Sequence, residues 1–145
     1  MKKTFSVLAL LFAAATALAQ SMPVIELTAG FHRIEAEVAH TQQSRMVGLM
    51  NRRAMPTQRG MLFVFDAAAP HCMWMKNTFI PLSVAFLDET GRIINVEDMQ
   101  PHTENNHCAA KPARYALEMN IGWFKRRGLK AGTTLAGIDR APGPQ

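Results

Sequence analysis

The sequence predicts an α+β fold, in the form of a compact, mostly antiparallel curled sheet or open barrel with two short helices. Several short segments have the composition of β-strands and are separated by turn residues. In one of them apolar and polar residues alternate with a period of two, and another is a continuous apolar run. Two further stretches show helical spacing, and both are short. Many strands with few helices indicate a domain built mainly from a sheet.

The first two predicted strands differ in how they are buried. At 33–38, Ile34, Ala36 and Val38 alternate with charged residues, which is typical of a strand with one face on the core. At 61–65 the residues are all apolar, and this short run predicts a strand buried on both faces.

Three more strands are predicted further along the chain. Residues 83–87 and 92–96 flank a short loop that ends in Gly91, which predicts a β-hairpin. Residues 114–119 predict another strand, and one of its faces carries Tyr115, Leu117 and Met119.

Each predicted helix has a capping residue. Thr41 is a suitable N-cap for a helix running to Met50, whose apolar face would be formed by Met46, Leu49 and Met50. Asn120 is a suitable N-cap for a second helix over 121–127, which Gly128 would end. The basic residues in its last turn suit the negative end of the helix dipole.

The N-terminus has the pattern of a secretory signal peptide. Lys2 and Lys3 precede an almost unbroken apolar stretch over 5–18, and Ala17-Leu18-Ala19 supplies the small residues of a cleavage site. The apolar stretch is shorter than the roughly 20 residues of a membrane span, so we expect no membrane span in the mature chain. The predicted location is therefore the bacterial periplasm or the medium, after cleavage near Ala19.

The mature chain has the length of one domain, which we place at 20–135. Residues 136–145, ending in Pro-Gly-Pro-Gln, have little to bury and are expected to form a disordered tail. The formal charge of +5 falls to +3 without Lys2 and Lys3. The remaining basic clusters lack the aromatic stacking residues of a nucleic-acid surface, so no nucleic-acid partner is predicted.

Several segments together resemble a known family. They are Arg45-Met46-Val47-Gly48-Leu49-Met50, Gly60-Met61-Leu62-Phe63, Trp74-Met75-Lys76-Asn77-Thr78, Pro81-Leu82, Phe86-Leu87-Asp88 and Leu117-Glu118 with Gly122. From about residue 37 to 135 the chain resembles domain-of-unknown-function family 192. The resemblance implies a compact β-rich domain, often exported, and it brings neither an activity nor catalytic residues. Members often carry an acidic residue directly after the Pro-Leu pair, where this chain has Ser83.

The chain has two cysteines, Cys72 and Cys108. An even number of cysteines in a small secreted domain predicts a disulfide, which would close a loop of about 36 residues. No Cys-x-x-Cys motif supports a thioredoxin-like oxidoreductase. A cysteine nucleophile would need a nearby base, and neighbouring residues on a strand point to opposite faces.

A copper site is one alternative for the segment around Cys72. On a strand, His71, Met73 and Met75 would share one face, and imidazole and thioether are ligand types that copper accepts. The simpler interpretation is that the methionines fill the core, as methionine often does. No cofactor is therefore predicted, and copper remains the alternative.

A polar cluster is the other candidate site. An aromatic wall beside a cation, an amide and a hydroxyl is typical of a ligand pocket, and the family-like segments supply Trp74, Lys76, Asn77, Thr78, Glu118 and Arg45. The same residues could be structural: a Lys–Glu or Arg–Glu ion pair, and a turn before Pro81 stabilised by side-chain hydrogen bonds.

Two classes of function follow from these residues. The first is a binding or accessory module of the cell envelope, whose partner is an unknown small molecule or an envelope protein. The second is an envelope enzyme that uses Lys76, Glu118 and Arg45. A periplasmic copper-binding protein is a special case of the first class, and the sequence leaves the ligand and the oligomeric state open.

Overall fold

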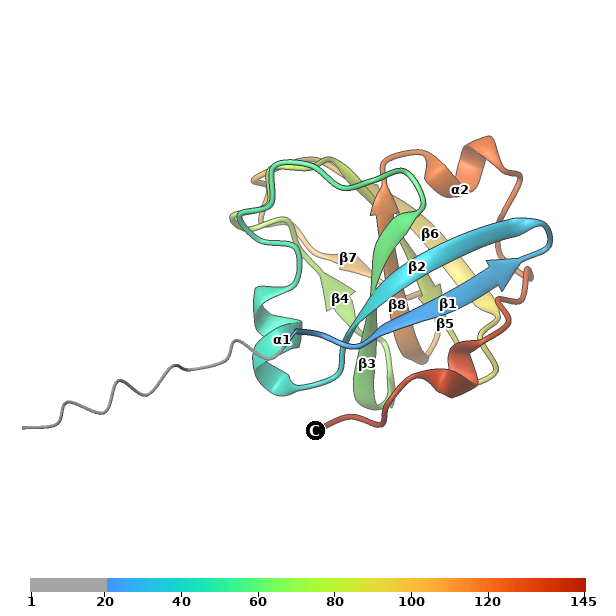
Figure 1. Ribbon diagram of the computed structural model, residues 1–145. Coiled ribbons are helices and arrows are strands. Elements are labelled where there is room, and N and C mark those ends of the chain that lie inside the picture. Colours follow the sequence, from blue (N-terminus) through green and yellow to red (C-terminus); the bar gives the residue numbers. More distant parts are fainter. Residues whose placement is uncertain (1–20) are drawn as a thin grey trace, which may run out of the picture.

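The computed structural model describes residues 21–145 of the 145-residue chain (Figure 1). The predicted signal peptide, 1–19, lies outside the described residues. Within the described part, the elements in chain order are β1 (Val24–Ala29), β2 (His32–Ala39), α1 (Gln42–Val47), β3 (Arg59–Ala69), β4 (Cys72–Met73), β5 (Leu82–Leu87), β6 (Ile93–Met99), β7 (His107–Cys108), β8 (Ala113–Asn120), α2 (Trp123–Arg126) and the 3-10 turn η1 (Ile138–Arg140).

The main sheet has six strands in the order β1-β2-β3-β8-β5-β6. Neighbouring strands are antiparallel except β2 and β3, which run parallel. The sheet is therefore mixed and mostly antiparallel, and it is not closed into a barrel. β4 and β7 form a separate two-stranded sheet. The predicted α+β class with a curled sheet and two short helices is confirmed.

Apolar side chains cover both faces of the sheet. On one face, Leu62, Leu117 and the two aromatic residues of α2, Trp123 and Phe124, belong to one buried cluster. The other face belongs to a second cluster that includes Met61, Phe63, Phe65, Val84, Phe86, Met75 and Met99. β3 is buried on both faces, as its continuous apolar run predicts, and β2 shows the predicted alternation.

Helix α1 is shorter than predicted. Thr41 is its N-cap, as predicted, because its hydroxyl accepts from the Ser44 amide and the Ser44 side chain binds back to the Thr41 amide. The helix ends at Val47, however, where Gly48 has a positive φ of 48°. The continuous apolar face predicted through Met50 is wrong, and Met46 is 68% exposed.

Helix α2 also differs from the prediction. It begins at Trp123, and Gly122, in the left-handed conformation at φ 73°, takes the N-cap position. Asn120 is the last residue of β8, and its side-chain amide donates to the carbonyl of Met55 at 2.9 Å. A long-range hydrogen bond therefore uses the side chain that the sequence assigns to capping.

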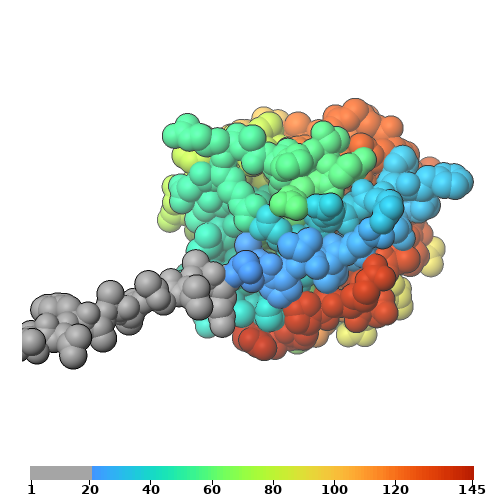
Figure 2. Space-filling model, in the orientation of Figure 1, coloured from blue at the N-terminus to red at the C-terminus, as the bar shows by residue number. Residues whose placement is uncertain are grey.

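The C-terminal residues, expected to form a tail, make specific contacts. Ile138 is buried in the first cluster, and Ala136 pairs with Thr28 of β1. The Gln145 amide donates to His40 at 2.7 Å. Figure 2 shows this segment, in red, lying along the blue β1. A single buried apolar residue and backbone pairing with the edge strand hold a segment that its composition alone describes as exposed.

Candidate functional site

Four family-like segments that are far apart in the sequence meet at one crevice. Its volume is about 30 Å³. We name it the Glu118 crevice, and its lining residues are Arg45, Met46, Val47, Gly48, Leu49, Met50, Phe63, Met73, Trp74, Thr78 and Glu118. The first six come from α1 and the turn after it, and the others come from β3, the 73–78 segment and β8. Four of the six segments by which the chain resembles its family therefore converge in space.

Glu118 is the most unusual residue of this crevice. It lies on β8, a strand inside the sheet, between Met61 of β3 and Val84 of β5. Its side chain is only 4% exposed and has no hydrogen-bond or ion-pair partner among residues 21–145. Burial disfavours the charged form and raises the pKa of Glu118 to about 8. At pH 7 the carboxyl therefore holds its proton and can donate a hydrogen bond.

Arg45 lines the crevice but does not pair with Glu118. Its guanidinium donates to the carbonyls of His40 at 2.8 Å and Val64 at 3.0 Å, and to the Asp66 carboxylate at 3.0 Å. These bonds join α1 to β3 and hold one wall of the crevice. The sequence suggested an Arg–Glu pair for Arg45, but within residues 21–145 its ion pair is with Asp66 instead.

Trp74 stands at the mouth of the crevice, and Lys76 lies beside it. The indole is 45% exposed, and the Lys76 ammonium lies 5.2 Å from the centre of the ring, within the range of a cation–π contact. Lys76 is exposed and has no carboxylate within 4 Å in the described part of the chain. Trp74 is therefore part of an exposed rim, and Lys76 adds a positive charge near it.

Asn77 and Thr78 shape the turn that carries this rim. Asn77 has a positive φ of 53°, which asparagine tolerates better than most residues, and its carbonyl accepts from the Asn51 amide. The Thr78 hydroxyl donates to the Lys76 carbonyl at 3.1 Å. Thr78 is buried and also lines the crevice, whereas Asn77 is exposed and does not. Thr78 makes the side-chain hydrogen bond that the structural interpretation expects, whereas Asn77 contributes to the turn through its backbone.

Two residues of the rim were missed as site residues from sequence. Met46 and Val47, at the end of α1, are 68% and 50% exposed and line the crevice. The sequence placed Met46 in the core because helical spacing was extended past Gly48. Gly48 is the signal that could have identified them. A helix that ends at this glycine leaves Met46 and Val47 exposed, while Leu49 after it is buried.

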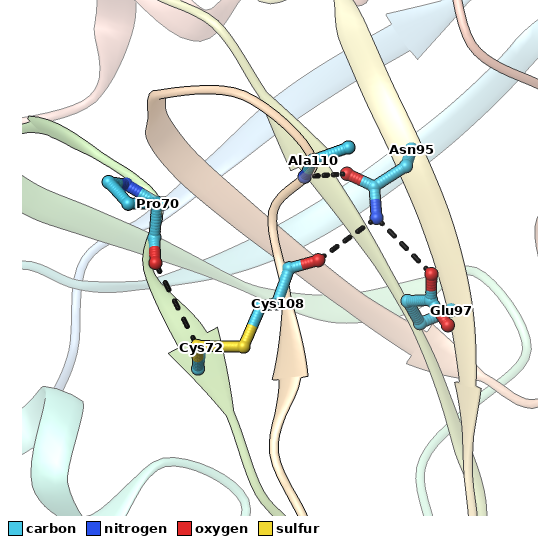
Figure 3. The surroundings of a disulfide bond; sticks show 6 residues. All are labelled: Pro70, Cys72, Asn95, Glu97, Cys108 and Ala110. Carbon is cyan, nitrogen blue, oxygen red and sulfur yellow. Dashed lines mark hydrogen bonds between the residues drawn. A yellow bond between two sulfur atoms is a disulfide. The ribbon is translucent and has the colours of Figure 1, made fainter.

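Cys72 and Cys108 form a disulfide that joins β4 to β7 (Figure 3). Near it, the side-chain amide of Asn95 on β6 donates to the Cys108 carbonyl at 3.1 Å and accepts from the Ala110 amide at 3.0 Å. The disulfide and Asn95 thus fix the segment that continues into Met73 and Trp74. The thiols are consumed, so neither cysteine offers a nucleophile or a thiolate ligand while the bond is intact.

The predicted metal ligands have separate roles in the packing. The imidazole of His71 stacks on Phe65, with ring centres 3.8 Å apart, and its Nε2 lies 2.8 Å from the Ala67 carbonyl. Met75 is fully buried in the second cluster, and Met73 lines the Glu118 crevice. Because β4 covers only two residues, these side chains do not extend from one regular strand as the prediction assumed.

Larger hollows exist elsewhere on the surface. One of about 530 Å³ lies between β6 and the loop after α2, and another of about 540 Å³ lies beside the β1–β2 hairpin. Both are open, and neither is lined by the 45–50 or 74–78 segment. We therefore assign the candidate site to the small crevice, where the unpartnered carboxyl lies. No helix within residues 21–145 has the length and hydropathy needed to cross a membrane.

The fold is similar to that of two solved bacterial proteins. One, from Sinorhizobium meliloti 1021 and described as a "putative transcription regulator", shares 37% identity with a TM-score of 0.72, over 77% of this chain and 90% of that one. The other, a protein of unknown function from Novosphingobium aromaticivorans DSM 12444, shares 29% identity with a TM-score of 0.76, over 81% of this chain and 88% of that one.

No match is found among curated proteins. The family model described as DUF192, "Uncharacterized ACR", matches residues 24–137, which is most of the chain. The protein therefore belongs to domain-of-unknown-function family 192.

Proposed function

We propose that this protein is a non-enzymatic binding module that is exported from the cytoplasm and captures a protein partner through the Glu118 crevice. One observation carries the proposal: four of the family-like segments meet around a carboxyl that is 4% exposed and has no partner in the described chain. A buried polar group without a partner is unfavourable for stability, so a retained one is a candidate for contact with a ligand.

The size of the crevice supports a protein partner over a small molecule. Pockets that enclose a drug-sized ligand have volumes of roughly 300–1,000 Å³. The Glu118 crevice has about 30 Å³, which accepts a single functional group. The exposed side chains of Met46, Val47 and Trp74 around it offer an apolar surface on which the remainder of a larger partner can pack.

Export and a role in the cell envelope belong to the same proposal. The basic residues Lys2 and Lys3, the apolar run after them and Ala19 support cleavage and release to the periplasm or medium. Fractionation of the producing bacterium tests this part. Full-length chain in the cytoplasm or in the membrane pellet would contradict it.

An enzyme is the second candidate, and the raised pKa of Glu118 favours it because such groups are common at active sites. The geometry of the described residues provides no free second titratable group beside this carboxyl in the crevice lining. Arg45 is the one other titratable residue that lines the crevice, and its donors are held by backbone carbonyls and Asp66. Lys76, the third member of the predicted set, stands outside the lining, over Trp74.

The experiment compares two matched surface variants. Val47 on the rim and Phe31 at the tip of the β1–β2 hairpin are both exposed apolar residues, and Phe31 lies outside the crevice lining. A photo-crosslinking amino acid at position 46 should link the exported protein to a partner in living cells. Val47→Glu should abolish that product and Phe31→Glu should not, with both melting temperatures unchanged.

If Phe31→Glu removes the crosslink as strongly as Val47→Glu does, the crevice is not the binding site. The same conclusion follows if neither variant has an effect.

A further inference from the structure

The hydrogen-bonding state of Glu118 specifies the chemistry of the group that the crevice accepts, given that the proposed function is correct. Glu118 is 4% exposed, faces the crevice and has no acceptor for its proton within residues 21–145. At pH 7 burial keeps the carboxyl protonated, so Glu118 is a hydrogen-bond donor without an acceptor in the described chain. The Glu118 oxygens are not among the side-chain atoms sealed from solvent without a partner, so they reach the crevice, where a ligand that offers an acceptor would pair with this donor.

The charges around the crevice indicate which acceptor suits it. The lining contains one charged residue besides Glu118, the cation Arg45. Lys76, over the Trp74 ring, places a second cation beside the mouth. The two strands that flank Glu118 present Met61 and Val84 to it, and the 73–78 segment contributes no acid to the lining. Asp66 pairs with Arg45 at 3.0 Å but is exposed and lies outside the lining, so the charges of the lining and of Lys76 still favour an anion over an ammonium group.

The shape indicates where that anion sits in its molecule. A volume of about 30 Å³ accommodates the head group, so the rest of the ligand must remain outside. The surface that it meets there is apolar, being formed by Met46, Val47 and Trp74. A carboxylate at the end of a chain, with apolar side chains behind it, meets all three conditions, and capture of a C-terminal carboxylate is a known mode of peptide recognition.

We propose that the Glu118 crevice binds the C-terminal carboxylate of a partner chain whose last residues are apolar. One carboxylate oxygen accepts the hydrogen bond from Glu118, and the last side chains pack on Met46, Val47 and Trp74. Arg45, fixed by its bonds to backbone carbonyls and Asp66, stabilises the negative charge without moving.

The pH dependence of binding has a defined direction. The carboxylate binds the protonated form of Glu118, so binding should weaken as Glu118 ionises above about pH 8. The apparent dissociation constant equals the intrinsic one divided by the protonated fraction, which gives a loss of roughly tenfold between pH 7 and pH 9. A ligand ammonium group would show the opposite trend, because it prefers the ionised carboxyl.

Three probes test the proposal on the exported protein. They are the peptide acetyl-Ala-Ala-Leu with a free carboxylate, the same peptide ending in an amide, and hexylamine. Binding is followed by NMR through the ¹³C shift of the Glu118 carboxyl and the amide shifts of Val47 and Trp74. We expect the free acid to bind at least tenfold more tightly than either other probe at pH 7, and about tenfold more weakly at pH 9 than at pH 7.

Glu118→Gln is the decisive variant, because an amide keeps a donor of the same shape and does not titrate in this range. It should bind the free acid within about threefold of the wild type at pH 7 and lose the change between pH 7 and pH 9. Glu118→Ala should lose at least tenfold. If Glu118→Ala does not fold, as a melting curve would reveal, the Glu118→Gln comparison and the three probes still decide the question.

Two results with the probes would overturn the inference while the proposed function stands. They are tighter binding of hexylamine with rising pH, and no binding of the free acid by a protein whose partner crosslink still requires Val47. Loss of binding in Glu118→Gln would also overturn it, because the carboxylate form would then be the one required. Failure of the proposed function is recognised separately, by a crosslink that does not depend on Val47.

Discussion

Replacing Glu118 by glutamine also gives a quantitative prediction for stability. The pKa of this carboxyl is raised from 4.5 to about 8 in the folded protein, because burial disfavours its charge. The folded state therefore binds the proton more tightly than the unfolded state does. Between about pH 4.5 and pH 8 the unfolded chain has lost this proton while the folded chain keeps it, so stability falls as pH rises through that window.

The magnitude follows from the size of the shift. A difference of about 3.5 pH units, at about 1.36 kcal/mol per unit, corresponds to a total of about 5 kcal/mol above pH 8 and almost nothing below pH 4. Glutamine has no proton to lose. The stability of Glu118→Gln relative to the wild type should therefore increase by about 4 kcal/mol between pH 5 and pH 9.

Urea unfolding at pH 5, 7 and 9 measures this difference. Comparison with Glu118→Gln removes the contributions of every other titrating group, because they are common to both proteins. Glu89→Gln is the matched control, since it removes an exposed carboxyl from the β5–β6 loop and leaves Glu118 in place. A pH dependence for Glu118→Gln no larger than that for Glu89→Gln would refute the assignment of a buried, protonated carboxyl.

Three further predictions concern the frame of the site. Replacing Cys72 and Cys108 together by serine should lower stability by roughly 3–4 kcal/mol, from the entropy of the 36-residue loop, and reductant should then have no effect on urea unfolding. Gly60→Ala should lower stability by about 3 kcal/mol or more, because its Cβ would lie 2.5 Å from a backbone carbonyl oxygen of β8, whereas Gly143→Ala, with open space around it, should leave the melting temperature unchanged. The hydrogen bond from Arg52 lowers the pKa of the half-buried Glu37 carboxyl, so Glu37→Gln should reduce the loss of stability below pH 4.5. At pH 7 this substitution should change the free energy of unfolding by less than about 1 kcal/mol, measured by urea titration.

The strands could be predicted because their burial follows a simple period. Residues 33–38 alternate and 61–65 do not, and the structure gives them one and two buried faces respectively. The hairpin of 83–87 with 92–96 is confirmed as β5 and β6. Strand β1 was missed; it is an edge strand, and Leu27 and Ala29 are its two fully buried residues. A short strand with few buried residues gives a weak signal.

The helix boundaries depended on contacts that a local pattern does not contain. Asn120 has the side chain of an N-cap, yet it is used by the carbonyl of Met55, 65 residues away. The helical spacing of Met46 and Leu49 is real, but Gly48 ends the helix between them. In both cases the predicted element exists and its limits are set elsewhere in the fold.

Four of the six residues predicted for the candidate site line the crevice, Lys76 and Asn77 do not, and the predicted pairing is not formed. Glu118, Trp74 and Thr78 do line one crevice, and Arg45 forms its wall. The expected partner of Glu118 is missing among the described residues, because Arg45 is held by Asp66. Composition indicates that charged residues occur together, but only the register of β3 against β8 determines which of them meet.

The serine that replaces the acidic residue common after the Pro-Leu pair does not disturb this site. Ser83 is fully buried, its hydroxyl donates to the carboxylate of Asp98 on the neighbouring strand, and it accepts from the Gly122 amide at 2.8 Å. The Asp98 carboxylate is therefore linked through the Ser83 hydroxyl to the Gly122 amide, and this chain of hydrogen bonds fixes the start of α2. In the pairing of β5 with β8, Ser83 is opposite Met119, whereas Val84 is opposite Glu118. Neighbouring residues on a strand point to opposite faces, so an acid at position 83 would face α2 and not the crevice. Among residues 21–145, Glu118 is therefore the one carboxyl in the lining, as the proposed contact with a partner's carboxylate requires.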